Sequence, residues 1–370
     1  SITKTHRIQI LEPDLSGNEM NYINDCLKTN WISSQGQYVK KFEQLFSELH
    51  FNRYSVSVSN GTSALHLSLK TLDIGRGDEV IVPAMTFVAT PMSVSYTGAK
   101  PVFVDTKYPS GLIDFNKIEE KITSRTKAII PVHLYGQCAN LHEIKKIAKK
   151  YKLKIIEDAS QAHGSSYHNI NIGQISDVAT FSFYPGKNLG AYGDAGAIVT
   201  NNDEYAKFAR MYANHGRIAK YDHEIEGLNS RLDNIQAAIL NVKLKYIEEW
   251  TEKRRWVAKT YTNLLSNISN ITTPKVEEKY NSSWHLYVIR TKQRDELTDF
   301  LNKNGVSTGI HYPIPLPFLK AYKHLGHSKD DFPISFSYQN QILSLPIYAE
   351  MDYDKIQYCC NLIAKFYNKN

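Results

Sequence analysis

Short apolar segments alternate with amphipathic segments between residues 38 and 160. Most of the apolar segments are continuous, as in strands buried on both faces, and the amphipathic ones carry apolar residues at helical spacing. This alternation predicts an α/β fold, with a mostly parallel sheet and helices on both of its faces. The predicted strands are 55–58, 79–83, 101–105, 127–134 and 153–156, and the predicted helices are 15–27, 40–49, 64–72, 115–122 and 141–151. The first helix is expected to start from Ser16 as its cap, with Glu19 three residues later.

The pattern changes after residue 200. Predicted here are a helix at 203–215, a long helix from 233 to about 264, a strand at 285–290, a helix at 294–304, a short strand at 306–310 and a terminal helix at 354–367. This mixture predicts a smaller α+β domain of ordinary size. We therefore expect a large domain over residues 1–250, which includes an N-terminal arm, and a small C-terminal domain over residues 251–370.

Composition and charge narrow the class of protein. The chain has 370 residues, of which 42% are hydrophobic and 22% charged, as is typical of a globular protein with room for two domains. The net charge of +7 is spread along the sequence, and the densest basic groups, 145–150 and 253–255, lie on predicted helices. This pattern favours solvated helix faces over a nucleic-acid interface, and it would suit an anionic small-molecule substrate.

The sequence also indicates the cellular compartment of the protein. No apolar run reaches the length of a membrane span, and the polar residues 1–4 do not have the pattern of a signal peptide. Cys26, Cys138, Cys359 and Cys360 lack metal-ligand spacing, and the adjacent pair is a poor candidate for a disulfide. We therefore expect reduced thiols, no metal, no membrane association and a cytoplasmic protein.

A glycine-rich loop with a single lysine lies between apolar segments at 181–183 and 197–199. The loop contains Gly186, Lys187, Gly190 and Gly193. Glycine allows tight turns and a close approach of the backbone to a ligand. A partly desolvated lysine in such a loop could form a Schiff base. The alternative interpretation is a glycine-rich hairpin with a solvated lysine.

A small polar turn, Ser-Asn-Gly-Thr-Ser at 59–63, joins a predicted strand to a predicted helix. The free backbone N–H groups and the dipole at the start of a helix favour a phosphate at such a position. Ordinary capping of the helix by Ser59, Asn60 or Thr62 is an equally good interpretation of these residues.

The unusual residues fall at the carboxyl ends of the predicted strands, where open α/β sheets bind ligands. They are the turn at 59–63, Phe87, the segments 133–137 and 158–163, and the Lys187 loop. An anion site, an aromatic face, the Asp158 carboxylate and a lysine together match the needs of pyridoxal phosphate. The first turn lacks the glycine pattern of a nicotinamide site, and Gly186-Lys187-Asn188 lacks the Ser or Thr of a P-loop. His133 and His163 are interpreted as structural.

Further motifs occur in order along nearly the whole chain. They are SNGTSAL at 59–65, PAMTFVAT at 83–90, PVHLYGQ at 131–137, EDASQAHG at 157–164, the Lys187 loop, LNSRLD at 228–233, HYPIP at 311–315 and SLP at 344–346. Jointly they resemble the DegT/StrS family of sugar-nucleotide aminotransferases, which are fold-type-I pyridoxal phosphate enzymes. The resemblance implies a large domain with a mostly parallel seven-stranded sheet and a smaller α+β C-terminal domain.

The resemblance also implies roles for individual residues. Lys187 would form the imine with pyridoxal phosphate, and Asp158 would pair with the pyridinium nitrogen. Gln161 would lie near the phenolic oxygen of the ring, and Phe87 would stack on its face. The phosphate would be held by Gly61, Thr62, Ser63 and Ser182, and by Asn229 from the other subunit of a homodimer whose active sites lie at the subunit interface. The sugar would be bordered by Tyr184, His311 and Tyr312.

A lysine at position 187 implies transamination, because family dehydratases have histidine there. L-Glutamate would give its amino group and leave as 2-oxoglutarate, and pyridoxamine phosphate would then aminate a keto group of a sugar nucleotide. The loop at 184–190 favours C3 of a dTDP-3-keto-6-deoxyhexose, whereas Trp31-Ile32-Ser33-Ser34 favours C4, as in GDP-perosamine synthases. Another alternative is a binding or regulatory protein that keeps the fold without turnover.

Overall fold

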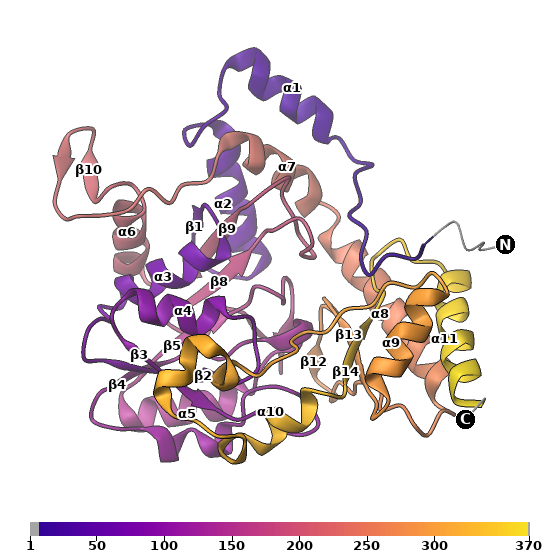
Figure 1. Ribbon diagram of the computed structural model, residues 1–370. Coiled ribbons are helices and arrows are strands. Elements are labelled where there is room, and N and C mark those ends of the chain that lie inside the picture. Colours follow the sequence, from indigo (N-terminus) through magenta and orange to yellow (C-terminus); the bar gives the residue numbers. More distant parts are fainter. Residues whose placement is uncertain (1–6, 369–370) are drawn as a thin grey trace.

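A seven-stranded sheet forms the centre of the computed structural model, which describes residues 7–368 (Figure 1). Its strands, in spatial order, are β1 (Tyr54–Val58), β9 (Gly196–Thr200), β8 (Val178–Ser182), β5 (Lys154–Asp158), β4 (Thr126–Ile129), β2 (Glu79–Pro83) and β3 (Lys100–Val104). All neighbours from β3 to β8 pair in parallel, and β9 is antiparallel to both β8 and β1. The predicted α/β class with a mostly parallel seven-stranded sheet is confirmed. Residues 1–4, which we compared with a signal peptide, lie outside the described part.

Alternate side chains of the strands enter cores on opposite faces of the sheet, because successive residues of a strand point to opposite sides. Ile81 and Ile155 pack on one face, while Val80 and Ile156 pack on the other. The first face is covered by α2 (Gln37–Leu49), α5 (Leu141–Tyr151) and α7 (Asn234–Leu244), and the second by α3 (Gly61–Thr71), α4 (Ala89–Tyr96) and α6 (Asp203–Tyr212). Helices on both faces were predicted from the alternation along the sequence.

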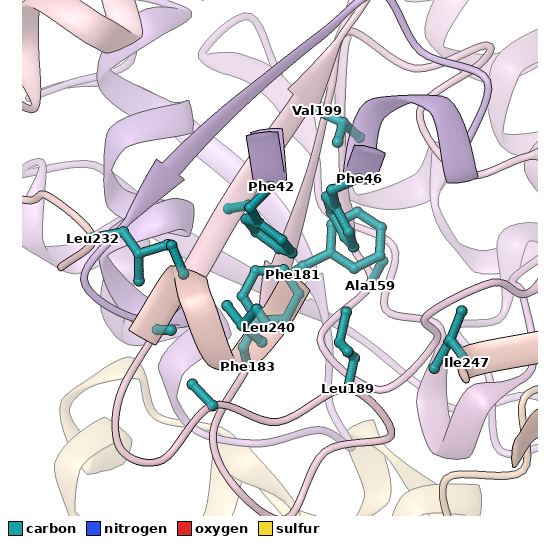
Figure 2. Packing of buried hydrophobic residues seen from close by; sticks show 14 of the residues in the cluster. Phe42, Phe46, Ala159, Phe181, Phe183, Leu189, Val199, Leu232, Leu240 and Ile247 are labelled. Atoms are coloured by element: carbon teal, nitrogen blue, oxygen red, sulfur yellow. The ribbon is translucent and has the colours of Figure 1, made fainter. Parts of the chain in front are cut away.

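A cluster of phenylalanines fixes the end of β8 against α2 (Figure 2). The Phe46 ring meets Phe181 and Phe183 edge-on, with ring centres 4.8 Å and 5.0 Å apart. Phe42 meets Phe183 in the same way, at 5.3 Å. These edge-to-face contacts add to the stabilisation from burial. Because they involve the residues on either side of Ser182, they anchor the strand end from which the Lys187 loop starts.

The C-terminal part has a second core around the antiparallel pair β13 (Tyr287–Arg290) and β14 (Ile342–Leu345). Helices α8 (Ile247–Leu265), α9 (Arg294–Lys303) and α11 (Tyr353–Asn368) surround this pair (Figure 1). The segment before α10 (Pro333–Tyr338) returns to the large sheet, where Leu316, Tyr322 and Phe332 pack with Phe103. Helix α8 begins in the core of the large sheet and continues into the second core. The division at residue 250 stays a prediction.

Short strands lie at the periphery of both parts. They are β6 (Ser166–Tyr167), β7 (Ile170–Asn171) and β12 (Tyr280–Asn281), which form a small sheet, and β10 (Arg217–Ala219) and β11 (Asp222–His223), which form a hairpin. Within residues 7–368 no helix combines the length and the apolarity needed to cross a membrane. The four cysteines are buried and unpaired, as expected from their spacing.

Some predicted elements were wrong in detail. Helix α1 (Glu19–Thr29) starts after Asn18, and the Ser16 hydroxyl donates to Asp14 instead of capping the helix. The long helix predicted from 233 to about 264 is broken into α7 and α8 at Lys245 and Tyr246. The residues next to the break still pack in the core of the large sheet, and α8 itself then continues into the second core.

The predicted helix at 115–122 and the predicted strand at 306–310 also differ from the structure. The first is two short 3₁₀ helices. The second forms only isolated bridges, from Val306 to Ile8 and from Gly309 to Ser344. These two positions pair with different segments, the N-terminal arm and β14, so they do not form one continuous ladder.

Replacing Phe46 by alanine should lower the free energy of unfolding by about 3–5 kcal/mol, because the fully buried ring leaves a cavity in the cluster that holds β8. Chemical denaturation of the two proteins measures the difference. Phe51→Ala is the matched control, since the Phe51 side chain is 72% exposed and its loss should change stability by at most about 0.5 kcal/mol. Equal losses in both variants would contradict the structural importance of the cluster.

Candidate active site

A cavity of about 460 Å³ lies at the carboxyl ends of the central strands. Its wall comes from the β1–α3 turn, the β2–α4 loop, the end of β5, the loop after β8, and segments near residues 285 and 311 of the C-terminal part. The predicted site residues that line it are Gly61, Thr62, Phe87, Asp158, Gln161, Ser182, Tyr184, Lys187, His311 and Tyr312. Ser63 and Asn229 do not line it. The volume falls in the range of small-molecule sites.

The loop after β8 presents Lys187 to this cavity. It closes through hydrogen bonds from the Phe183 N–H to the Ala195 carbonyl, at 2.8 Å, and from the Ala191 N–H to the Phe183 carbonyl, at 2.7 Å. Gly190 is required for the turn, because a Cβ there would lie 2.6 Å from the Pro185 carbonyl oxygen. The loop is a hairpin connection, as the alternative interpretation held, but its lysine is partly buried and faces the cavity.

Burial lowers the pKa of the Lys187 amine, and the negative charge of Asp158 opposes this shift. The amine makes no hydrogen bond or ion pair with any residue in the range 7–368. A lowered pKa raises the fraction of neutral amine at a given pH. Burial thus moves Lys187 toward the neutral form that a nucleophile or a proton acceptor needs.

Asp158 ends β5, lines the same cavity and is 5% exposed. Its carboxylate accepts hydrogen bonds from the Thr90 hydroxyl, at 2.7 Å, and from the Ser160 N–H, at 3.2 Å. These two donors fix the orientation of the carboxylate. We did not single out Thr90 from the sequence, although it ends the PAMTFVAT motif.

The turn at 59–63 supports both interpretations of its sequence. The Asn60 side chain caps α3 by accepting a hydrogen bond from the Ser63 N–H, at 2.7 Å. Gly61 and Thr62 line the cavity, where the first N–H groups of a helix have no partner within the helix. A Cβ on Gly61 would lie 2.8 Å from that of Ser182, so only glycine lets the start of α3 approach the end of β8 so closely. The result is an N–H-lined corner suited to an anion.

Hydrogen bonds connect the residues on the side of the cavity where Tyr312 and Phe87 lie. The Gln161 amide donates to the Tyr312 hydroxyl, at 2.7 Å, and its oxygen accepts from the Tyr135 N–H, at 2.8 Å. The Tyr135 hydroxyl donates to the His311 carbonyl. The Phe87 ring lies 6.0 Å from that of Tyr312 and is 54% exposed, so its face is available to a flat ligand.

Two histidines of the C-terminal part also line the cavity. The His311 ring bonds the Ser344 hydroxyl, at 2.8 Å, and burial, followed by the charge of Lys187, lowers its pKa to about 4. His285, which we did not predict, bonds the Asn188 amide oxygen, at 3.0 Å, and burial holds its pKa well below the usual value. Both rings are therefore neutral near pH 7.

The other histidines considered from the sequence are structural. His133 is fully buried, bonds Glu157 at 2.8 Å through Nε2, and accepts from the Ala139 N–H through Nδ1. His163 is also fully buried and donates through Nε2 to the Ser182 carbonyl, at 2.8 Å. Both hold strand ends of the site in place without lining the cavity.

Asn229 lies away from the cavity of its own chain. It accepts a hydrogen bond from Arg231, at 3.1 Å, and forms a bridge with Asn214. Ser230 and Arg231, which follow it, line a larger depression of about 940 Å³ beside the α1–α2 loop. Trp31 belongs to the same depression and is 53% exposed.

Comparison with known proteins places this geometry in a family. Residues 13–364 match the model of the DegT/DnrJ/EryC1/StrS aminotransferase family. The chain is 43% identical over 346 residues, 93% of its length and 94% of the relative's, to the dTDP-3-amino-3,6-dideoxy-α-D-galactopyranose transaminase of Aneurinibacillus thermoaerophilus. It is 34% identical over 368 residues, 98% of its length and 99% of the relative's, to the GDP-perosamine synthase of Escherichia coli O157:H7.

Solved structures agree with this match. Streptomyces venezuelae DesV in complex with a ketimine intermediate superposes with a TM-score of 0.95 at 37% identity, covering 98% of both chains. The pyridoxal phosphate form of a sugar aminotransferase from Streptococcus pneumoniae superposes with a TM-score of 0.91 at 27% identity, covering 96% of this chain and 97% of the other. The chain is therefore a member of the DegT/DnrJ/EryC1/StrS aminotransferase family.

Proposed function

We propose that this enzyme transfers the amino group of L-glutamate to C3 of a dTDP-linked 3-keto-6-deoxyhexose. The family and the named relatives make it an aminotransferase of sugar nucleotides that uses pyridoxal phosphate. The observation that carries the proposal is a lysine of lowered pKa and a buried carboxylate that face one cavity without an ion pair between them. The choice of C3 is supported by the 43% identity to a 3-amino-sugar transaminase.

The residues present fit the cofactor. Pyridoxal phosphate supplies an aldehyde that joins amines and a ring that takes up electrons. In the proposal Asp158 holds the ring nitrogen protonated, and Phe87 covers one face of the ring. Gln161 would hold the phenolic oxygen. The corner made by Gly61, Thr62, Ser63 and Ser182 holds the phosphate, although the Ser63 N–H is already engaged by Asn60.

Lys187 has two roles in the proposed reaction. It would bind the cofactor aldehyde in the resting enzyme, and as a free amine it would move the proton between the α-carbon of the amino acid and the C4′ carbon of the cofactor. A base must be unprotonated to accept this proton, and burial lowers the pKa of Lys187 in the required direction. Tyr184, His311 and Tyr312 border the space left for the sugar, and the neutral His311 ring can accept or donate a hydrogen bond there.

We further propose that the active site is completed by a second copy of the chain. Asn229 lies outside its own cavity, beside the 940 Å³ depression that includes Arg231 and Trp31. Exposed apolar side chains such as Trp31 and Ile32, 53% and 48% exposed, favour a covered surface. In a homodimer Asn229 would reach the cofactor phosphate of the other subunit.

Amination at C4 is the alternative. It is supported by the Trp31–Ser34 segment and by the 34% identity to a GDP-perosamine synthase. A binding protein without turnover is disfavoured, since such a role needs neither the Lys187 amine nor the Asp158 carboxylate.

The position of amination can be tested directly. Purified enzyme with pyridoxal phosphate and L-glutamate should convert a dTDP-3-keto-6-deoxyhexose to the 3-amino sugar and release 2-oxoglutarate in equal amount. Nuclear magnetic resonance of the product locates the new amine. If the enzyme converts only 4-keto sugar nucleotides, the proposed position of amination changes from C3 to C4, and the assignment as an aminotransferase still holds.

Borohydride reduction should attach the cofactor covalently to Lys187, and peptide mass spectrometry would identify the modified residue. Lys187→Ala should take up no label and lose at least about 10²–10⁴ in turnover, the usual contribution of a positioned acid–base group. Lys243 is an internal control, because burial lowers its pKa as well, yet it does not line this cavity. Label on Lys243 but not on Lys187 would refute the assignment.

Asp158→Asn should shift the titration of Lys187 in the apoenzyme to lower pH. The Asp158 charge raises the pKa of the amine, so its removal leaves only the lowering effect of burial. The measurement is the rate of acylation of Lys187 as a function of pH, normalised to the exposed Lys149 and read by mass spectrometry. An unchanged or upward-shifted midpoint would show that the two groups do not interact in this way. Thr90→Val, which keeps the charge, should leave the midpoint nearly unchanged.

A further inference from the structure

A separate cavity of about 280 Å³ lies between the β13–β14 pair and the loop after β3. Its walls include Tyr108, Tyr135, Lys275, Arg290 and Tyr338, and it shares no lining residue with the active-site cavity. Its volume is close to the lower end of the range for small-molecule sites, about 300 Å³. Nothing in the proposed transamination uses it.

Arg290 is unusual among the arginines of residues 7–368. Its guanidinium carbon lies 4.9 Å from the centre of the Tyr108 ring and 4.7 Å from that of Tyr338, and its N–H groups have no polar partner in this range. The other partly or fully buried arginines all donate to oxygen atoms; they are Arg217, Arg231, Arg254, Arg255 and Arg294. Ring faces attract the charge of a guanidinium but leave its in-plane donors unused.

The charge around the cavity is positive. Lys275 is exposed on its wall and has no ion pair within residues 7–368, and no carboxylate is among the lining residues. Burial raises the pKa of the Tyr338 hydroxyl, and the negative charge of Asp105 acts in the same direction. Its carboxylate is already engaged by the Ser335 and Ile334 N–H groups, at 2.9 Å and 3.0 Å.

We propose that this cavity binds a small oxyanion, either a phosphate ester or a carboxylate. Arg290, held between two tyrosine rings, offers the fork of N–H donors that pairs with two oxygen atoms of such a group. Lys275 supplies a second positive charge at the wall. The tyrosine rings and the apolar side chains of Met85 and Val288 contact the rest of the ligand. The small volume disfavours a whole sugar nucleotide.

A ligand in this cavity would touch a residue that supports the active site. Tyr135 lines the cavity, while its hydroxyl donates to the His311 carbonyl and its N–H donates to Gln161. One tyrosine thus connects this cavity to two residues that line the active site. The cavity is therefore suited to a metabolite that adjusts sugar binding, as well as to one that only stabilises the fold.

Isothermal titration of the pyridoxal phosphate-loaded enzyme in chloride buffer, separately with inorganic phosphate and with acetate, tests the proposal. We expect saturable binding of at least one anion, weakened about tenfold or more in Arg290→Gln, since hydrogen bonds to charged groups contribute about 1.5–3 kcal/mol. Binding of phosphate alone would indicate a phosphate ester as the natural ligand, and binding of acetate alone a carboxylate. Loading with the cofactor keeps its own phosphate corner filled.

Arg53→Gln is the matched control, because Arg53 also lies over a tyrosine ring, 5.3 Å from the centre of Tyr54, but lines neither cavity. Lys275→Gln changes an exposed side chain, so it tests the site even if Arg290→Gln fails to fold, and it should weaken binding severalfold. The proposal is overturned if neither anion binds to the wild-type enzyme. It is also overturned if the folded Arg290→Gln variant binds the anion with wild-type affinity. If Arg290→Gln does not fold, wild-type affinity in Lys275→Gln overturns it. The assay contains no sugar or glutamate, so its result is independent of the transamination.

Discussion

The parallel pairing of β5 with β8 is the constraint on which the site depends. Asp158 pairs with Thr180 in this register, so Asp158 at the end of β5 and the loop that follows Ser182 leave the sheet at the same edge. The edge-to-face contacts of Phe181 and Phe183 with Phe46 hold the end of β8 in this place. A change of one residue in the register would turn these rings to the other face and move Lys187 away from Asp158.

The electrostatics of the cavity follow from this arrangement. A lysine and an aspartate that share a low-dielectric site would ordinarily pair, because an isolated buried charge is costly. Here the Asp158 carboxylate is instead satisfied by Thr90 and Ser160, and the Lys187 amine responds to burial by a lowered pKa. The two groups therefore line one cavity without an ion pair between them, and both stay available to a ligand.

Much of this could be predicted from the sequence, because the strands and helices of the large sheet have strong periodicity and the candidate residues fall at strand ends. Asp158, Lys187 and the turn at 59–63 were predicted to meet, and they line one cavity. Thr90 and His285 were missed because a hydroxyl and an imidazole acquire their partners only through packing between distant segments. The break between α7 and α8 was missed for a related reason. Apolar residues continue at helical spacing on both sides of residues 245 and 246, so helical periodicity alone does not reveal the break.

The C-terminal part closes the site because several contacts of different kinds fix it to the sheet. Leu316, Tyr322 and Phe332 return to the apolar core beside Phe103. Ser344 of β14 holds His311, and Tyr135 of the large sheet holds the carbonyl of the same residue. His311 and Tyr312 thus depend on both parts of the chain. The Lys187 loop starts from the sheet but is also fixed to the C-terminal part, because the neighbouring Asn188 donates to the Ser283 carbonyl and bonds His285. The position of Asp158 is accordingly set by the sheet and its loops, whereas the lysine loop and the wall that borders the sugar are held where the two parts meet.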